Sequence, residues 1–458
     1  MNALLIVCGL AFLALIAEIV NARKILHVAI ILGLLAAGVV LALDWNLDLR
    51  HFNDMLVFDN FAIAFTALIL AVSFFWFCLS SEYFIGQSHQ TDRTALIIFT
   101  IAGGIMMVSF HNMSMLFLGI EILSISLYVL AGSNKESFFS NEASFKYFIM
   151  GAFATGFLLM GIALVYGTTG SFDISEISIF VSANKASLPG FFYVGLFLML
   201  VGIAFKISAV PFHFWAPDVY SGSPTLVTAF MSTVVKIAAV GAFYKIFSQC
   251  FLQVQPMLES TLQIMVILTL MVANVTAVYQ DNVKRMLAYS SVGHVGYILL
   301  GFISDSATFE GTLFYYLAGY AAASLIAFGI AFNVERSEGS LSIESFYGLG
   351  RKNPWISVAL TISLLSLAGI PPLAGFFAKY TILARAIEAH HLLLTILAII
   401  TSLIGVFYYF RVIIVMFAKE PSSNPLVLSP MSRIVLSALA ILVLILGLFP
   451  EWLFHLLA

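Results

Sequence analysis

Apolar runs long enough to cross a bilayer follow one another along almost the whole chain. A transmembrane helix needs about 20 mostly apolar residues. Of the 458 residues, 62% are hydrophobic and 9% are charged, which is too few charges to cover a soluble domain of this size. We predict an all-α, polytopic membrane protein with about 14 transmembrane helices. Their approximate extents are 2–20, 26–43, 60–79, 94–110, 112–131, 143–166, 191–211, 223–248, 259–279, 284–303, 309–333, 354–389, 392–417 and 432–450.

The basic residues outside these segments or near their ends predict an orientation. Cytoplasmic loops of membrane proteins carry an excess of lysine and arginine. With an external N-terminus, thirteen basic residues fall on or near the cytoplasmic side, and only Arg50, Lys185, Lys245 and Arg385 fall on the outer side. An even number of spans then places both termini outside.

Four ionisable side chains lie deep inside otherwise apolar segments. They are Glu121 in MLFLGIEILSISL, Lys206 in LMLVGIAFKISAV, Lys236 in TAFMSTVVKIAAV and Lys379 in AGIPPLAGFFAKYTIL. A charge near the middle of a lipid-embedded helix is costly, so such residues usually belong to an ion or proton pathway. The pattern predicts a membrane protein that moves protons.

Two predicted spans contain helix-breaking residues close to a lysine. Prolines crowd the end of the seventh span after Lys206, and the motif AGIPPLAGF interrupts the twelfth span before Lys379. Proline removes a helix donor and clashes with the preceding turn, so both helices should break or kink there.

The interrupted spans hold equivalent places if the chain contains two copies of a five-helix unit. The copies would be 94–248 and 259–417, preceded by three helices in 1–93 and followed by one in 432–458. Because five is odd, the copies run in opposite directions and form two inverted five-helix repeats, each with a broken helix. Paired interrupted helices of this kind indicate the ion site of a transporter.

Lys206 and Glu121 are the first pair expected to carry chemistry. Desolvation disfavours the charged form of a buried lysine, and a nearby carboxylate favours it. Glu121 is the only carboxylate near the centre of a predicted span, so it is the natural partner of Lys206. The alternative is a static ion pair that fixes helix registration.

Lys236 and Lys379 are the candidates for the rest of a proton relay. The alternative for Lys236 is a lysine that snorkels to the membrane surface, but it lies too deep to reach that surface easily. The hydroxyls of Ser232 and Thr233, one turn earlier, are candidate water ligands. Lys379 is the expected outlet counterpart of Lys206, and its alternative role is that of an interface lysine near a helix end.

Two histidines join these candidates. A histidine titrates near neutral pH and bridges hydrogen-bond networks. His294, in AYSSVGHVGYILL, is therefore a relay candidate, and His213, beside the seventh-span break, is a weaker one. For both, the alternative is a structurally satisfied histidine.

Other function classes lack support in the sequence. Glycine-rich dinucleotide motifs and P-loops are absent, and the three cysteines lie far apart with no CxxC spacing. The basic residues are scattered singly or in pairs, which argues against nucleic acid. We expect no cofactor and no metal in this chain, and a lipid bilayer around it.

Three segments carry a resemblance to a known family. The runs FKISAVPFHFWAPDVYSGSPTLVTAFMSTVVKIAA, QDNVKRMLAYSSVGHVGYILLG and SLAGIPPLAGFFAKY resemble signatures of the antiporter-like membrane subunits of respiratory complex I. The match runs in the same order along nearly the whole chain. The PDVYSGSPT loop, a lysine at position 379 and an early C-terminus resemble the N type of this family more than its L and M types.

The resemblance implies a role for each candidate. Glu121 and Lys206 look like the family's ion pair, Lys236 like its central relay and Lys379 like its outlet. Several relatives carry a lysine or histidine on the eleventh span, where FYYLAGYAAASLIAF has only tyrosines, so His294 and water would bridge that gap.

The resemblance also implies partners and a location. The protein would be a proton-translocating subunit of NADH:quinone oxidoreductase in a bacterial inner membrane, with both termini periplasmic. Flavin mononucleotide, iron–sulfur clusters and quinone would bind partner subunits. The partners would include other membrane subunits of complex I, a second antiporter-like subunit among them.

Two rival functions remain open from the sequence. One is a subunit of a multisubunit sodium/proton antiporter without a redox link. The other is a structural scaffold that joins pumping subunits.

Overall fold

The computed structural model describes residues 1–20, 22–81, 89–304, 309–420, 425–454 and 456–457. The chain forms two compact units. Unit 1 comprises residues 1–77, 83–215 and 234–261, and unit 2 comprises residues 78–82, 216–233 and 262–458.

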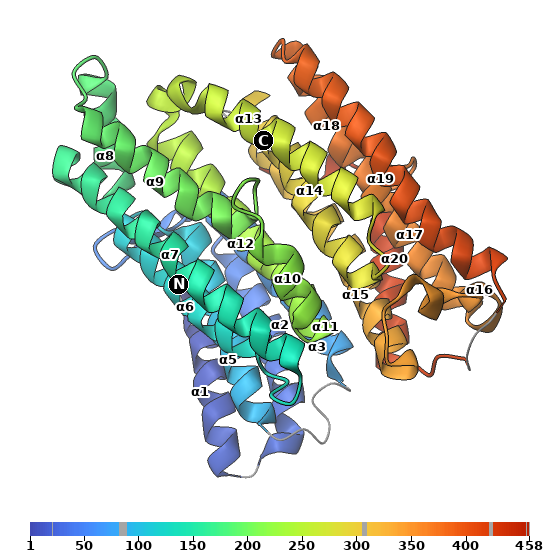
Figure 1. The fold of residues 1–458 in the computed structure, drawn as a ribbon. Coiled ribbons are helices and arrows are strands. Elements are labelled where there is room, and N and C mark those ends of the chain that lie inside the picture. Colours follow the sequence, from blue (N-terminus) through green and yellow to red (C-terminus); the bar gives the residue numbers. More distant parts are fainter. Residues whose placement is uncertain (21, 82–88, 305–308, 421–424, 455, 458) are drawn as a thin grey trace. The chain divides into compact units, whose positions relative to one another are not determined.

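Unit 1 contains most of the N-terminal half (Figure 1). Its elements are α1 (Asn2–Ile19), α2 (Arg23–Leu43), β1 (Leu49–His51), β2 (Leu56–Phe58), α3 (Asn60–Leu79), α5 (Gln90–Ser109), α6 (Met113–Ala131), α7 (Phe138–Thr169), α8 (Ile174–Asn184), α9 (Gly190–Ile207) and α12 (Lys236–Tyr244), with a π-helical turn at Lys245–Cys250 and a 3₁₀ turn at Leu252–Val254.

Unit 2 contains most of the C-terminal half. Its elements are α10 (Trp215–Gly222), α11 (Thr225–Phe230), a π-helical turn (Met231–Val235), α13 (Gln255–Val278), α14 (Val283–Ser304), α15 (Glu310–Glu338), a 3₁₀ turn (Ile343–Phe346), α16 (Leu349–Lys352), α17 (Pro354–Ala368), α18 (Ala374–Glu388), α19 (Leu392–Ala418), α20 (Pro430–Leu448) and α21 (Glu451–Phe454).

Thirteen helices in the described part of the chain are long and apolar enough to cross a membrane. They correspond to thirteen of the fourteen predicted segments. The remaining segment, 354–389, forms two helices of 15 residues each, α17 and α18. The prediction of a helical, polytopic membrane protein is confirmed, and so is the break in the twelfth span.

Two elements between the spans depart from the all-α prediction of spans and short loops. Strands β1 and β2 form a short antiparallel hairpin with Leu49 opposite Phe58. Its polar turn lies between two spans, where strands can pair outside the hydrocarbon region. Helix α8 forms where a plain connection was expected, because Asp173 caps its first amides and its buried positions 174, 177 and 181 recur at helical spacing.

Close helix packing in unit 1 depends on small residues. Helices α7 and α9 run side by side (Figure 1). A Cβ added at Gly161 would lie 2.7 Å from the carbonyl oxygen of Gly195, so both positions need glycine for the backbones to approach this closely.

Helix α15 lies at the centre of unit 2. It packs against α11, α14, α17, α18 and α20, and almost its whole length is buried. Helices α19 and α20 instead present large exposed apolar side chains, as expected of lipid-facing helices. The unit therefore buries a helix that carries several tyrosines.

Candidate functional site

Lys206 lies in the last turn of α9, at the break predicted for the seventh span. The helix ends because Ser208 adopts a left-handed conformation with φ 66°. The lysine is buried, and its Nζ donates a hydrogen bond to Ser124 Oγ on α6. The Nζ also lies 5.7 Å from the ring centroid of Tyr147 on α7, where a cation–π interaction stabilises the ammonium.

An indole side chain holds this environment in place. Trp215 stacks on Tyr147 with ring centroids 4.6 Å apart, and its Nε1 donates to the carbonyl oxygen of Phe205 at 2.9 Å. The residue before Lys206 is thus tied to the aromatic ring that faces its ammonium. Sequence reasoning identified the lysine but neither Ser124 nor Tyr147.

Glu121 lies on α6, three residues before Ser124, and is half-buried. It interacts electrostatically with Lys206. In the described chain, however, the hydrogen bond of Lys206 goes to Ser124, and no direct ion pair joins Lys206 to Glu121. The residue that contacts Lys206 directly is therefore Ser124, which lies about one helical turn after the expected partner Glu121. His213 is buried beside the break, with its ring centroid 4.5 Å from that of Phe214.

Lys236 is the first residue of α12 and is completely enclosed by protein. It follows the π-helical turn Met231–Val235, a local widening that is frequent at functional sites and that the sequence analysis missed. The hydroxyls of Ser232 and Thr233 both donate to the carbonyl oxygen of Ala229 in their own helix. These two hydroxyls are therefore already satisfied as donors.

His294 lies on α14 within a set of hydroxyl groups in unit 2. Its Nδ1 is 2.7 Å from Tyr316 Oη on α15. Its ring centroid is 4.9 Å from that of Tyr320, whose hydroxyl donates to Ser291 Oγ at 2.8 Å. The tyrosines of the eleventh span thus contact His294 directly. The sequence contained one signal that Tyr316 belongs to this site: it lies four residues before Tyr320, so both tyrosines occupy one face of the helix.

Lys379 lies in the second turn of α18, after the break at 369–373. Helix α17 ends at Ala368, and the following Gly369 has a φ of 86°, a left-handed conformation that favours glycine. Lys379 is buried, and its Nζ donates to the carbonyl oxygen of Ala368 at 3.0 Å and to Ser402 Oγ at 3.4 Å. The ammonium therefore lies at the negative end of the α17 dipole. It also lies 4.7 Å from the ring centroid of Tyr297.

Two further lysines are buried, although the sequence analysis placed them at the ends of predicted spans, near the membrane surfaces. Lys284, at the start of α14, donates to the carbonyl oxygen of Ser223 and interacts electrostatically with Glu335. Lys245 opens the π-helical turn at the end of the eighth span. Their burial depends on segments distant in sequence, so a local pattern gives no signal for it.

The chain is similar to a known family over most of its length. A family model described as "NADH:quinone oxidoreductase/Mrp antiporter, TM" matches residues 111–405. NADH-quinone oxidoreductase subunit N of Cytophaga hutchinsonii is 46% identical over 456 residues, covering 98% of both chains. The subunit N of Flavobacterium psychrophilum is 42% identical, covering 98% of this chain and 99% of the relative.

Solved structures share the fold. A chain of respiratory complex I from Thermus thermophilus is 31% identical, with a TM-score of 0.83 and coverage of 99% of this chain and 98% of that one. A chain of the Mrp complex from Dietzia sp. DQ12-45-1b has a TM-score of 0.88 over 99% of this chain and 95% of that one, but its 21% identity shows the fold alone. The chain therefore belongs to the NADH-quinone oxidoreductase subunit N family, the proton-translocating, antiporter-like membrane subunits of respiratory complex I.

Proposed function

We propose that protons cross this subunit through Glu121, Lys206, Lys236, His294 and Lys379. One observation carries the proposal. In each compact unit, a buried lysine lies beside a broken membrane helix, where a hydroxyl group and an aromatic ring contact its ammonium. A buried ammonium supported by neutral groups is sensitive to any nearby change in charge, because interactions in a low dielectric are strong.

The proposed first step is proton release from Lys206. A charge shift that arrives from a neighbouring membrane subunit moves or neutralises Glu121, and Lys206 then loses the electrostatic support that favours its ammonium form. Its N–H bond breaks and the proton passes to water. The remaining amine keeps its contact with Ser124 by donating one of its two N–H groups, because the hydroxyl hydrogen of Ser124 is already donated to the carbonyl oxygen of Ile120.

The later steps use Lys236 of unit 1 and then groups of unit 2. Lys236 receives the proton and passes it on. His294, with the hydroxyls of Tyr316, Tyr320 and Ser291, supplies a chain of groups that can both donate and accept. Lys379 releases the proton outside, and cytoplasmic water reprotonates the relay. His213 is a weaker candidate for a proton-handling role beside the first break.

An inverted repeat would explain why two similar sites occur. In the proposed repeat, 94–248 and 259–417 are the two copies, flanked by 1–93 and 432–458. The breaks after Ile207 and after Ala368 support it, because each falls in the fourth helix of its copy and each begins with a left-handed residue. The distribution of basic residues supports an orientation with both termini on the periplasmic side of a bacterial inner membrane.

The redox steps belong to other subunits in this proposal. Flavin mononucleotide, iron–sulfur clusters and quinone bind those subunits, and this chain contacts other membrane subunits, including a second antiporter-like one. The family supports this division, since the matching chain from Thermus thermophilus comes from a structure of respiratory complex I.

A Lys206→Arg variant tests proton release. Arginine keeps the positive charge but holds its proton, so the ratio of protons pumped to NADH oxidised should fall in liposomes that contain the purified complex. Lys146→Arg is the matched control, because Lys146 lies partly exposed on α7 and pairs with Glu142 at 2.9 Å. An unchanged ratio in Lys206→Arg would refute release at this site.

The same preparation separates the rival functions. A sodium/proton antiporter predicts that transport depends on sodium. A structural scaffold predicts that Lys206→Ala and Lys379→Ala complexes assemble and pump normally. The proposal predicts the opposite result in both cases.

A further inference from the structure

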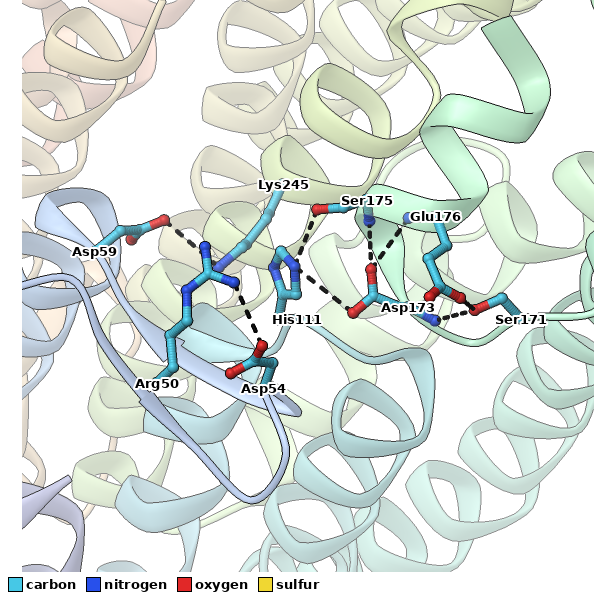
Figure 2. A network of polar contacts seen from close by, with 9 residues as sticks. All are labelled: Arg50, Asp54, Asp59, His111, Ser171, Asp173, Ser175, Glu176 and Lys245. Carbon is cyan, nitrogen blue, oxygen red and sulfur yellow. Dashed lines mark hydrogen bonds and ion pairs between the residues drawn. The ribbon is translucent and has the colours of Figure 1, made fainter. Parts of the chain in front are cut away.

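A cluster of charged side chains surrounds the end of the eighth span in unit 1 (Figure 2). Lys245 opens the π-helical turn there, and its Nζ lies 3.9 Å from the carboxylate of Asp59, the residue before α3. His111, between α5 and α6, has its Nε2 3.0 Å from Ser175 Oγ and 3.7 Å from Asp173 Oδ2. We call Lys245, Asp59, His111 and Asp173 the Lys245 cluster.

The cluster joins four parts of the chain that are distant in sequence. Asp173 has a second role, because its Oδ1 accepts the amide hydrogens of Ser175 and Glu176 and caps α8. This fixes its other oxygen toward His111. On the far side of the cluster, Arg50 of β1 pairs with Asp54 at 3.5 Å.

The side chains of the cluster differ in their exposure to solvent. The side chain of Lys245 is 1% exposed, that of His111 14%, that of Asp173 27% and that of Asp59 31%. Arg50 and Asp54, the next groups outward, are each 52% exposed. The enclosed ammonium of Lys245 thus lies in a cluster whose other titratable groups have access to solvent.

The surroundings of His111 keep its imidazole in the neutral form. Burial lowers the pKa of His111, Lys245 and Arg50 lower it further, and Asp173 and Asp59 act in the opposite direction. The imidazole is therefore neutral at neutral pH and has one ring nitrogen free of a proton.

The cluster is connected to Lys236 through one continuous helical segment. Lys236 begins α12, which runs to Tyr244, and Lys245 follows directly. Lys245 lies nine positions after Lys236, which corresponds to roughly 13 Å along the axis at the usual helical rise. Both lie in unit 1.

We propose that the Lys245 cluster is a proton outlet of unit 1, parallel to the outlet at Lys379. This inference rests on the proposed function, since it takes Lys236 as the source of the proton. Under the proposed orientation, the cluster faces the periplasmic side.

The proposed step is a simple proton transfer. The Lys245 ammonium, charged by Lys236 through water, loses an N–H bond and becomes a neutral amine. The proton binds the free ring nitrogen of His111, which becomes an imidazolium beside Asp173, and then leaves to bulk water. His111 returns to the neutral form, and the Lys245 amine accepts the next proton.

The test uses the complete complex in liposomes and compares protons pumped per NADH oxidised. The variants are Lys245→Arg, Lys379→Arg, the double variant and Lys206→Arg. Arginine preserves the charge and the contact with Asp59 but does not release its proton, so a purely structural role would survive. Lys185→Arg is the control, because Lys185 is an exposed lysine next to α8.

Parallel outlets predict a specific pattern. Each single outlet variant keeps part of the pumping supported by this subunit, and the double variant falls to the level of Lys206→Arg. The inference is overturned if Lys245→Arg pumps at the wild-type ratio and the double variant equals Lys379→Arg. If Lys206→Arg itself pumps normally, the proposed function fails whatever Lys245 does.

A second variant keeps the inference testable if Lys245→Arg does not assemble. In a Lys379→Arg background, pumping should decline as the pH on the release side falls below about 6.5, because His111 is then increasingly protonated. His111→Gln should lower pumping and remove that pH dependence. Identical pH profiles with and without His111 would overturn the inference.

Discussion

Gly375 lies where α18 approaches the backbone of α17 closely, at Ser366. Its amide donates to Ser366 Oγ at 3.1 Å. A Cβ at this position would lie 1.7 Å from the carbonyl oxygen of Ser366 and 2.7 Å from its carbonyl carbon. A Gly375→Ala substitution therefore forces α18 away from α17.

The size of the effect follows from these distances. Real Cβ atoms essentially never lie within 3.0 Å of a neighbour, so the contact must open by the difference between 3.0 Å and 1.7 Å, about 1.3 Å. Overpacking typically costs about 1–3 kcal/mol, and a rigid backbone neighbour places this site at the upper end. Lys379 Nζ holds the Ala368 carbonyl at 3.0 Å and Ser402 Oγ at 3.4 Å, so a shift of this size breaks one or both bonds.

The assay measures stability and pumping together. We expect the purified Gly375→Ala complex to melt at a lower temperature and to pump fewer protons per NADH in liposomes. Gly405→Ala is the matched control in the same unit, since a Cβ there meets its nearest neighbour at an ordinary 3.5 Å. A Gly375→Ala complex with wild-type melting and pumping would refute the steric argument.

Three further outcomes are expected. Ser124→Ala removes the hydroxyl that accepts from Lys206, a charged hydrogen bond worth about 1.5–3 kcal/mol, and should lower the pumping ratio while Ser126→Ala does not. Burial lowers the pKa of His111, so its neutral form stabilises the fold above pH 6.5, and that contribution is lost as the pH falls toward the folded-state pKa. His111→Gln should therefore reduce the loss of thermal stability between pH 7.5 and 5.5. An unchanged pH dependence of the melting temperature would contradict this. Glu335→Gln weakens the electrostatic support of buried Lys284 and should lower the melting temperature of the complex, whereas Glu338→Gln at the exposed end of the same helix should not.

The breaks in the seventh and twelfth spans were predictable because their cause is local. Glycine and proline in AGIPPLAGF disrupt helical geometry in any tertiary context, and α17 and α18 separate at that motif. The short hairpin at 49–58 and α8 were missed because neither is required by the hydrophobic pattern. The sequence nevertheless contained the signals for α8, which are the capping residue Asp173 and the apolar residues Ile174, Ile177 and Val181 at helical spacing.

The partners of the buried lysines were not predictable in the same way. Sequence reasoning chose Glu121 for Lys206 because it was the only central carboxylate, whereas the structure gives the hydrogen bond to Ser124. One helical turn separates the two residues. A serine on an apolar helix is too common to stand out, and which serine faces a lysine depends on the rotation of two packed helices.

The sequence alone determined that this chain crosses a membrane many times, that two of its helices are interrupted, and that lysines lie inside its spans. Hydrophobic length, helix breakers and single charges act over a few residues, so they can be read locally. The tertiary structure decided which groups those lysines contact, that Tyr316 lies against His294, and that Lys245 and Lys284 are enclosed. Those features arise where segments distant in sequence come together, and only the packed structure specifies that arrangement.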